Sequence, residues 1–466
     1  MKSIAISNLC RPLGVPWPTG KDQIFNGVNI DSRTIKPGDC FFALRGTNFD
    51  GHDFLRQVQD KGAVCAVVDK DPPSDLKIPT IRVSDTVAAL GQLASWYRRQ
   101  IPAAVIGITG SAGKTSTREI LYHILSSRFR CRQAPKSYNN QIGVPLTLLS
   151  AEPDDQYLIV EIGSNHPGEI APLARMARPN IAVITQIAPA HLEGFGSIGA
   201  IIEEKASILE GLEPEGKIFI NGDIPELAAH IRRKYNLPFV MVGQSPYCQV
   251  RAESAHSCGT SGWLRIEGQT IPVPLAGTAS LRNVLTVWAV CQELGVSLSD
   301  FVGSLRTVQP ASMRLQIEHI GPVTLLNDCY NANPASMENA IECLSQMAAQ
   351  QKRRAVLIAG DMKELGPHSI GLHRQIGRFA AERGIDVILA AGEFAESILE
   401  GAQRSDNAQT RLEQLHLFAG VEGLCNNVHL FVRPDDIILV KASRSARFEL
   451  VVARLKDLFG LQQTTE

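Results

Sequence analysis

Residues 103–127 read AAVIGITGSAGKTSTREILYHILSS, a pattern that few folds can accommodate. An apolar run leads into a turn with two glycines, Gly110 and Gly113, and a segment with helical periodicity follows. A strand, a short turn and a helix in this order build parallel sheets covered by helices. The glycines let successive backbone N–H groups face an anion, and the helix presents its positive N-terminal end to the same point. The stretch therefore predicts an α/β fold with a phosphate site at this turn.

The turn differs from the common nucleotide-binding loop at one position. The pattern G-x-x-x-x-G-K-[ST] has glycine where this chain has Ile108. The chemistry is retained, because Lys114 can reach the β- and γ-phosphates and the Thr115 hydroxyl can bind the Mg²⁺ that accompanies ATP. An ordinary glycine-rich turn with one surface lysine is the alternative, but the strand before and the helix after favour nucleotide binding. The expected cofactor-binding residues are Thr109, Gly110, Ser111, Ala112, Gly113, Lys114, Thr115 and Ser116.

The chain divides into three parts. Its 466 residues, 44% of them hydrophobic, exceed what one core of roughly 100 to 200 residues holds. We place the parts at 1–100, 101–311 and 312–466. The pattern of expected strands and helices changes at the phosphate loop, and a new series of them begins at the third part. Strands are expected at CFFAL, GAVCAVVD, AAVIGITG, YLIVEIG, IAVITQI, VTLLND, RAVLIAGD, DVILAAG and DIILVKAS, and a helix at PASMENAIECLSQMAAQ. This order predicts α/β units with parallel sheets.

Charge and cysteine content argue against several kinds of partner and site. The 46 Lys and Arg nearly cancel the 47 Asp and Glu, without blocks of like charge, which disfavours nucleic acid and anionic membranes as partners. The ten cysteines include no C-x-x-C pair, which disfavours structural zinc and disulfides and favours a reducing cytoplasm. No run reaches about 18 apolar residues, and the start lacks a cleavable leader pattern. We expect a cytoplasmic monomer without a membrane span that acts on small molecules.

The loop form T-G-x-x-G-K-[ST] resembles that of the Mur ligases and the folylpolyglutamate synthetases, which use ATP to join an amino group to a carboxylate. The resemblance to the Mur ligases extends over nearly the whole chain, through DSRTIKPGDCFFALRGTNFDGHDF, YNNQIGVPLTLL, EIGSNHPGEIAPLARMARPNIAVITQIAPAHLEGFGS, NDCYNANPASMENAI, GDMKELG and KASRSARFE. It implies a small α/β domain that binds a UDP substrate, a central ATP-binding domain and a Rossmann-like C-terminal domain. The last would bind an incoming dipeptide and close over ATP.

The motifs also discriminate within the family. YNANP at residues 330–334 and GDMKELG resemble the member that joins D-alanyl-D-alanine to UDP-N-acetylmuramoyl-tripeptide. The tetrapeptide D-N-P-R, typical of the member that adds diaminopimelate, does not occur in the sequence. The chain departs from the usual pattern at Arg282, where histidine is common, at Asn327, where aspartate is common, and at Ala442, which replaces glycine. None of these changes removes a group that the chemistry needs.

A metal site is expected beside the phosphate loop. Glu161 closes the run YLIVE, and the carboxyl end of a parallel strand borders the crevice where such sheets bind ligands, so Glu161 can hold Mg²⁺ opposite Thr115. The resemblance implies that His191 is a metal ligand and that carbon dioxide converts Lys205 to a carbamate. A carbamate is an anionic oxygen donor that can orient a second Mg²⁺. Taken alone, the two would be a hydrogen-bonded histidine and a solvated helical lysine.

The resemblance assigns further residues to the substrates. Asn283 matches an asparagine near the adenine, with a helix N-cap or a buried amide with local partners as the alternatives. Arg314 would pair with phosphate and Asp328 would accept hydrogen bonds from the ribose, although both could form interdomain ion pairs instead. The candidates for the uridine nucleotide are Ser32, Arg33, Arg45, Asn48, Asp50 and His52, and those for the dipeptide are Tyr330, Asn331, Asn333, Ser443 and Arg444.

The expected mechanism follows from the need to activate a carboxylate. The γ-phosphoryl group of ATP would give an acyl phosphate, which the amine then attacks, with Lys114, Lys205, His191 and Arg314 as catalytic residues. Domain closure would exclude water. Two alternatives stay open at this point: another amide ligase of the superfamily, and a nucleotide switch that does not ligate. The sequence contains no N-K-x-D tetrapeptide of the kind that guanine-binding switches use.

Overall fold

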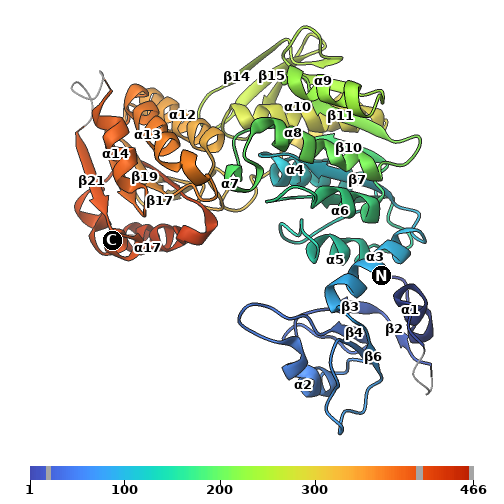
Figure 1. Cartoon of the computed structure of the whole chain (residues 1–466). Coiled ribbons are helices and arrows are strands. Elements are labelled where there is room, and N and C mark those ends of the chain that lie inside the picture. The colour runs from blue at the N-terminus through green and yellow to red at the C-terminus, as the bar shows by residue number, and fades with distance from the viewer. Residues whose placement is uncertain (17–21, 406–412, 461–466) are drawn as a thin grey trace.

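The structure is a computed structural model that describes residues 1–16, 22–405 and 413–460. It confirms the expected α/β class, with three domains that are each built around their own sheet. The central domain lies between the other two (Figure 1). Within the described ranges, no helix is both long and apolar enough to cross a bilayer.

The first domain is built on four short parallel strands in the order β3-β4-β5-β6. The two middle strands, DCFF and CAVV, are buried on both faces, as is typical of parallel sheets. Helix α3 begins after Asp85, whose carboxylate accepts the Val87 and Ala88 N–H groups, and it packs on α5 and α6 of the central domain. The elements are β1 (Ile4–Ala5), α1 (Ile6–Leu13), β2 (Ile24–Phe25), β3 (Gly27–Asn29), β4 (Asp39–Phe42), η1 (Gly51–Phe54), α2 (Leu55–Asp60), β5 (Cys65–Val68), β6 (Thr80–Arg82) and α3 (Thr86–Arg98).

The central domain is a seven-stranded, wholly parallel sheet in the order β13-β12-β11-β10-β7-β9-β8. Alternate residues of β7 face opposite layers, with Val105 in one hydrophobic core and Ile106 in the other. Its elements are β7 (Ala104–Thr109), α4 (Lys114–Ser126), β8 (Cys131–Gln133), α5 (Gly143–Leu149), β9 (Tyr157–Glu161), α6 (Ile170–Ala177), β10 (Ile181–Ile184), α7 (Leu192–Phe195), α8 (Ile198–Ala206), η2 (Ser207–Gly211), β11 (Lys217–Asn221), α9 (Pro225–Lys234), β12 (Val240–Gly243), β13 (Val250–Arg251), α10 (Thr278–Glu293) and α11 (Leu298–Leu305).

The sequence did not lead us to expect a small antiparallel sheet between β13 and α10. It consists of β14 (Ser254–Ser257), β15 (Gly262–Ile266) and β16 (Gln269–Val273). The last two strands form a hairpin around Glu267 and Gly268, which both have positive φ, the geometry of a tight two-residue hairpin turn. The sheet packs on α10 and so supports the helix that carries Asn283.

The third domain has a six-stranded sheet in the order β17-β18-β22-β19-β20-β21, parallel except for the edge strand β17. The expected helix at PASMENAI is α12, and a reciprocal capping box between Asn333 and Ser336 fixes its start. The elements are β17 (Gln316–Ile320), β18 (Val323–Asn327), α12 (Pro334–Gln351), β19 (Ala355–Gly360), η3 (Gly366–His368), α13 (Ser369–Glu382), β20 (Val387–Ala391), α14 (Ala395–Gln403), β21 (Gln414–Phe418), α16 (Val421–Asn427), η4 (Val428–Leu430), β22 (Ile437–Lys441), η5 (Arg444–Ala446) and α17 (Glu449–Gly460).

Candidate active site

The phosphate loop joins the end of β7 to the start of α4, as the sequence predicts. Gly110 has φ 143°, and a Cβ there would lie 2.1 Å from Thr185 Oγ1. Gly113 caps α4 with φ 87°, and a Cβ there would lie 2.6 Å from Asn283 Oδ1. Both positions therefore require glycine, because a side chain would be strained and would collide with its neighbours.

The polar groups of the loop favour an anion. Lys114 Nζ donates to the Gly110 carbonyl (2.6 Å), and burial lowers the pKa of Lys114. Among the described residues, Ser111 Oγ and Arg314 Nε are buried without a hydrogen-bond partner. Buried donors of this kind are costly unless a ligand satisfies them. Together with the N-terminal end of α4, they fit a bound phosphate chain.

A carboxylate and a hydroxyl meet beside the loop. Glu161 is 1% exposed at the end of β9, and Thr115 Oγ1 donates to its Oε2 atom (3.0 Å). Asn139 Nδ2 donates to Oε1 of the same carboxylate (2.9 Å). Hydroxyl and carboxylate oxygens are the ligands that Mg²⁺ prefers, with phosphate oxygens as further ligands. The residues present therefore fit a magnesium ion at this place.

The structure brings the two remaining predicted catalytic groups to the same side of the loop. His191 follows β10 with φ 53°, lines the cleft described below and bonds through Nδ1 to Glu364. Burial lowers the pKa of His191, against the opposing effect of Glu364. Lys205 on α8 is 2% exposed, donates to Ser164 Oγ (2.7 Å) and lies 5.2 Å from the centre of the Phe195 ring. Burial, reinforced by the charge of Lys114, lowers the pKa of Lys205 to about 7.

A cleft of about 1630 Å³ connects the central and third domains. Its lining from the central domain includes the phosphate loop, Glu161 and His191. Across the cleft, the third domain contributes several of the predicted dipeptide residues, namely Tyr330, Asn331 and Asn333. Arg314 also lines the cleft, with its guanidinium 4.4 Å from the centre of the Tyr330 ring. Residues 111–116 of the phosphate loop, three of the four predicted metal ligands and three of the five predicted dipeptide residues thus line one cleft.

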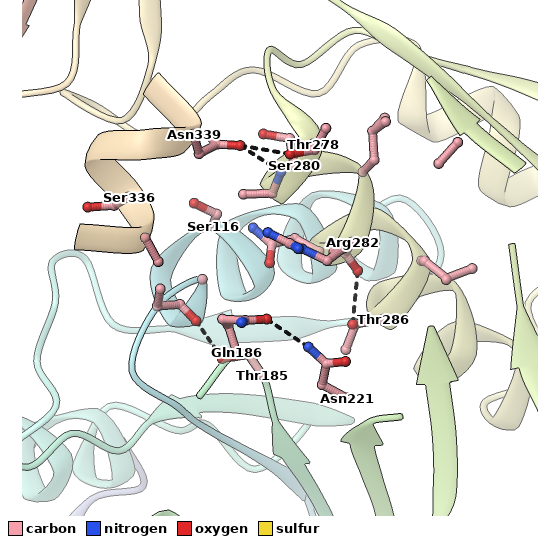
Figure 2. Close-up of a pocket in the computed structure, with 18 of the residues that line it drawn as sticks. Ser116, Thr185, Gln186, Asn221, Thr278, Ser280, Arg282, Thr286, Ser336 and Asn339 are labelled. Atoms are coloured by element: carbon pink, nitrogen blue, oxygen red, sulfur yellow. Dashed lines mark hydrogen bonds between the residues drawn. The ribbon is translucent and has the colours of Figure 1, made fainter. Parts of the chain in front are cut away.

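A second cavity, of about 1300 Å³, opens on the other side of the loop and is drawn in Figure 2. Asn283 lines it from within α10, whose N-cap is Gly277, so the helix-cap interpretation of Asn283 is wrong. Figure 2 shows Gln186 and Asn221 facing each other, and Asn221 Nδ2 donates to Gln186 Oε1 (2.8 Å). Neither residue was predicted from the sequence, although each lies at or just after the carboxyl end of a parallel strand, as Glu161 does.

Asp328 directly follows β18 and is already well bonded. Its Oδ2 atom accepts from Lys441 Nζ (2.6 Å) and its Oδ1 atom accepts from the Leu315 N–H (3.1 Å). Lys441 is 1% exposed and was missed, because nothing in the sequence links it to a residue 113 positions earlier. Asp328 and Lys441 both line the second cavity, so the ribose contact of Asp328 stays a prediction.

The six candidates for the uridine nucleotide all lie in the first domain, where His52 is in the short helix η1 and Asp50 is its N-cap. Arg45, Asp50 and His52 share one cluster, in which His52 is buried and its Nδ1 atom is 2.6 Å from Asp50 Oδ1. Arg45 donates to Asp69 (2.6 Å), and Asn48 is exposed. Ser32 and Arg33 lie on a separate loop, whose carbonyls accept from Lys61.

The last two dipeptide candidates lie after β22. Ser443 Oγ accepts from the Lys363 N–H (2.9 Å), and Arg444 Nη1 lies 3.5 Å from Glu449 Oε2. Neither lines the cleft that contains the other three candidates. The structure therefore groups Tyr330, Asn331 and Asn333 and leaves the other two beside them in the same domain.

Three family models match successive parts of the chain. The model for the catalytic domain of the Mur ligase family matches residues 24–98, the Mur ligase middle domain matches residues 108–291, and the Mur ligase glutamate ligase domain matches residues 313–444. Each match falls within one of the three domains described above.

Relatives match over nearly the full length. The UDP-N-acetylmuramoyl-tripeptide–D-alanyl-D-alanine ligase of Escherichia coli (strain K12) is 34% identical, covering 94% of this chain and 95% of the relative. The ligase of the same name from Bacillus subtilis (strain 168) is 30% identical, covering 95% and 94%. A crystal structure of MurF from Acinetobacter baumannii has a TM-score of 0.86 at 30% identity, covering 98% of this chain and 99% of that chain. The chain therefore belongs to the Mur ligase family.

Proposed function

We propose that the protein is an ATP-dependent ligase that joins D-alanyl-D-alanine to the terminal carboxylate of UDP-N-acetylmuramoyl-tripeptide, in peptidoglycan precursor synthesis. The observation that carries the proposal is the cleft in which the phosphate loop faces Tyr330, Asn331 and Asn333. The names of the relatives support the same reaction. A nucleotide switch would not need residues for an acceptor substrate opposite the phosphate loop. Another ligase of the superfamily would not need the motif YNANP at residues 330–334.

ATP would lie with its phosphates on the loop and its base toward Asn283 in the second cavity. Lys114 and Arg314 would neutralise the charge that develops as the γ-phosphoryl group moves to the substrate carboxylate. Mg²⁺ held by Thr115 and Glu161, with His191 as a further ligand, would supply additional positive charge at the phosphates. The amine of the dipeptide would then attack the acyl carbon, and the amide bond would form as the carbon–oxygen bond to phosphate breaks and the amine loses a proton. ADP and inorganic phosphate would be released.

The surroundings of Lys205 support the carbamate proposal. Only a neutral amine adds to carbon dioxide, and burial with the nearby charge of Lys114 lowers the pKa of Lys205 to about 7. A large share of the amine is therefore neutral at physiological pH. Ser164 Oγ, 2.7 Å from Nζ, would remain as a hydrogen-bond donor to the carbamate oxygens.

Each domain would bind one substrate. Domain 1–100 would hold the UDP moiety through Ser32 and the other five uridine candidates named above. Domain 101–311 would hold ATP, and domain 312–466 would hold the dipeptide and close over the nucleotide. We also propose that the enzyme acts as a cytoplasmic monomer. All ten cysteines are unpaired, which suits a reducing compartment.

Phosphate release with a panel of amines tests the proposal. With ATP, Mg²⁺ and UDP-N-acetylmuramoyl-tripeptide present, D-alanyl-D-alanine should start steady release of phosphate, whereas D-glutamate, L-alanine and diaminopimelate should not. The mass of the UDP-N-acetylmuramoyl peptide should rise by that of two alanine residues. Full turnover with a single amino acid in place of the dipeptide would contradict the proposed acceptor, and ATP hydrolysis without any amide product would contradict ligation.

A further inference from the structure

The loop GDMKELG, residues 360–366, has no role in the function proposed above. It leaves the end of β19 and is fixed to the third domain at several points. The Asp361 carboxylate accepts the N–H groups of Glu393 (3.1 Å) and Phe394 (2.9 Å). The Met362 N–H donates to His373 Nε2 (2.9 Å), and the Lys363 N–H donates to Ser443 Oγ (2.9 Å). The next residue, Glu364, is therefore held in a set position relative to this domain.

Glu364 reaches the central domain. Its Oε2 atom bonds to His191 Nδ1, and its backbone carbonyl accepts the Glu193 N–H (3.1 Å). Gly366 also lies against Glu193, since a Cβ at residue 366 would be 3.2 Å from the Glu193 Cα. In Figure 1, α7 lies at the side of the central domain that faces the third domain, where these contacts form.

Both ends of this contact have uncommon backbone conformations. Glu364 has φ 64° and His191 has φ 53°, which is the left-handed region that residues other than glycine rarely adopt. Such conformations are strained and persist where surrounding contacts hold them. The strain lies at the one carboxylate–imidazole contact that links the loop to the proposed metal site.

The contact determines which imidazole nitrogen is available. A carboxylate accepts a hydrogen bond but cannot donate one, so the Nδ1 atom of a neutral His191 that faces Glu364 carries the proton. The lone pair is then at Nε2. Histidines that bind metals commonly have their other ring nitrogen held by a carboxylate in this way.

We propose that Glu364 is a positioning residue, supplied by the third domain, that fixes the ring orientation and tautomer of His191 for a divalent cation at the proposed ligase site. The inference rests on the proposed function. It links the placement of the third domain to the metal side of the central domain. With Glu364 removed, His191 would keep its place in the chain but would lose its fixed tautomer.

The variants Glu364→Ala and Glu364→Gln test the proposal, with Glu396→Gln on the exposed face of α14 as the matched control. The first measurement needs no substrate. In protein labelled with ¹⁵N-histidine, long-range proton–nitrogen spectra report the tautomer of each ring, and His191→Gln identifies the His191 signals. We expect the Nδ1–H form in the wild type and in Glu396→Gln. Glu364→Ala should shift His191 toward the Nε2–H form, and Glu364→Gln, whose amide oxygen can still accept, should retain most of the wild-type signal.

The second measurement is steady-state ligation against Mg²⁺ concentration. Losing a carboxylate that supports a metal ligand typically costs 10- to 100-fold in metal affinity or activity. We expect Glu364→Ala to lower kcat and raise the Mg²⁺ requirement on that scale, with the KM for D-alanyl-D-alanine changed by less than about threefold. Wild-type spectra in Glu364→Ala would overturn the proposal, as would a changed tautomer with unaltered kcat and Mg²⁺ requirement. If the wild type failed to ligate, the proposed function would fail while the spectra still decided the role of Glu364.

Discussion

Lys205 lies in surroundings that differ greatly from those of an ordinary surface lysine. It is 2% exposed, and its pKa is lowered to about 7 by burial and by Lys114. In ¹³C-bicarbonate, the protein should show a carbamate carbon signal that grows between pH 6 and pH 8, because deprotonation supplies the reacting amine. Lys205→Ala should lose the signal and lower the ligation rate by about a hundredfold or more, whereas Lys217→Ala, at an exposed lysine, should retain both. A normal rate in Lys205→Ala would contradict the carbamate.

Functional residues that are near each other in the sequence can be predicted from it. The loop around Lys114 could be predicted because two glycines, a lysine and a threonine lie within six residues. Gln186 follows a recognised strand end and could have been found by the argument that gave Glu161. Lys441 could not be found without the family motif around it, since its partner Asp328 lies 113 residues earlier. Contacts of this kind depend on sheet order, which periodicity does not determine.

At the level of elements, the central parallel strands were predictable because they are short, apolar and followed by helices. The hairpin β15–β16 was missed, although Glu267 and Gly268 between two alternating segments are typical of a tight turn. The antiparallel edge strand β17 was missed for a different reason. Its pattern QIEHI is mostly half-buried, so it does not resemble the fully buried strands beside it.

Helix α13 holds the loop 360–366 through a buried neutral histidine. His373 is fully buried, its Nε2 atom accepts the Met362 N–H (2.9 Å), and its Nδ1 atom is 2.6 Å from the Ser369 carbonyl. A proton on Nε2 would face that N–H group. Burial accordingly lowers the pKa of His373, so the folded domain binds this proton less readily than the unfolded chain does. The stability from this group is fully present above about pH 6.5 and is lost as the pH falls.

Hydrogen exchange of α13 and the loop 360–366 tests whether their stability falls as the pH falls. In the wild type, the free energy of opening should fall between pH 8 and pH 5, after correction for intrinsic exchange rates. His373→Gln, whose amide oxygen can accept from Met362, should open about 1 to 3 kcal/mol more easily at pH 8. The difference in opening free energy between His373→Gln and the wild type should be about 1 kcal/mol smaller at pH 5. The exposed His368→Gln should follow the wild type, and a constant disadvantage of His373→Gln at both pH values would contradict a neutral buried His373.

On the scale of the whole molecule, the proposed site is divided between two domains. Lys114, Glu161 and His191 belong to the central domain, and Tyr330 belongs to the third. Arg314 lies in the connection between them, and both of its neighbours, Met313 (φ 56°) and Leu315 (φ 46°), have left-handed backbone conformations. A connection with two uncommon conformations in three residues is a natural place for a hinge, because a change of φ there relieves strain.

Closure about residues 310–315 should therefore depend on ligands that both domains contact. We expect a non-hydrolysable ATP analogue, added together with UDP-N-acetylmuramoyl-tripeptide, to reduce the radius of gyration measured by small-angle scattering. The tripeptide nucleotide alone should leave the radius close to that of the free enzyme, because Arg314 and the third domain meet the phosphates only when the loop is filled. Lys114→Ala should bind the analogue weakly and stay near the free radius. An unchanged radius in wild-type protein shown by calorimetry to bind both ligands would contradict the hinge, since the cleft of about 1630 Å³ would then be the working form of the site.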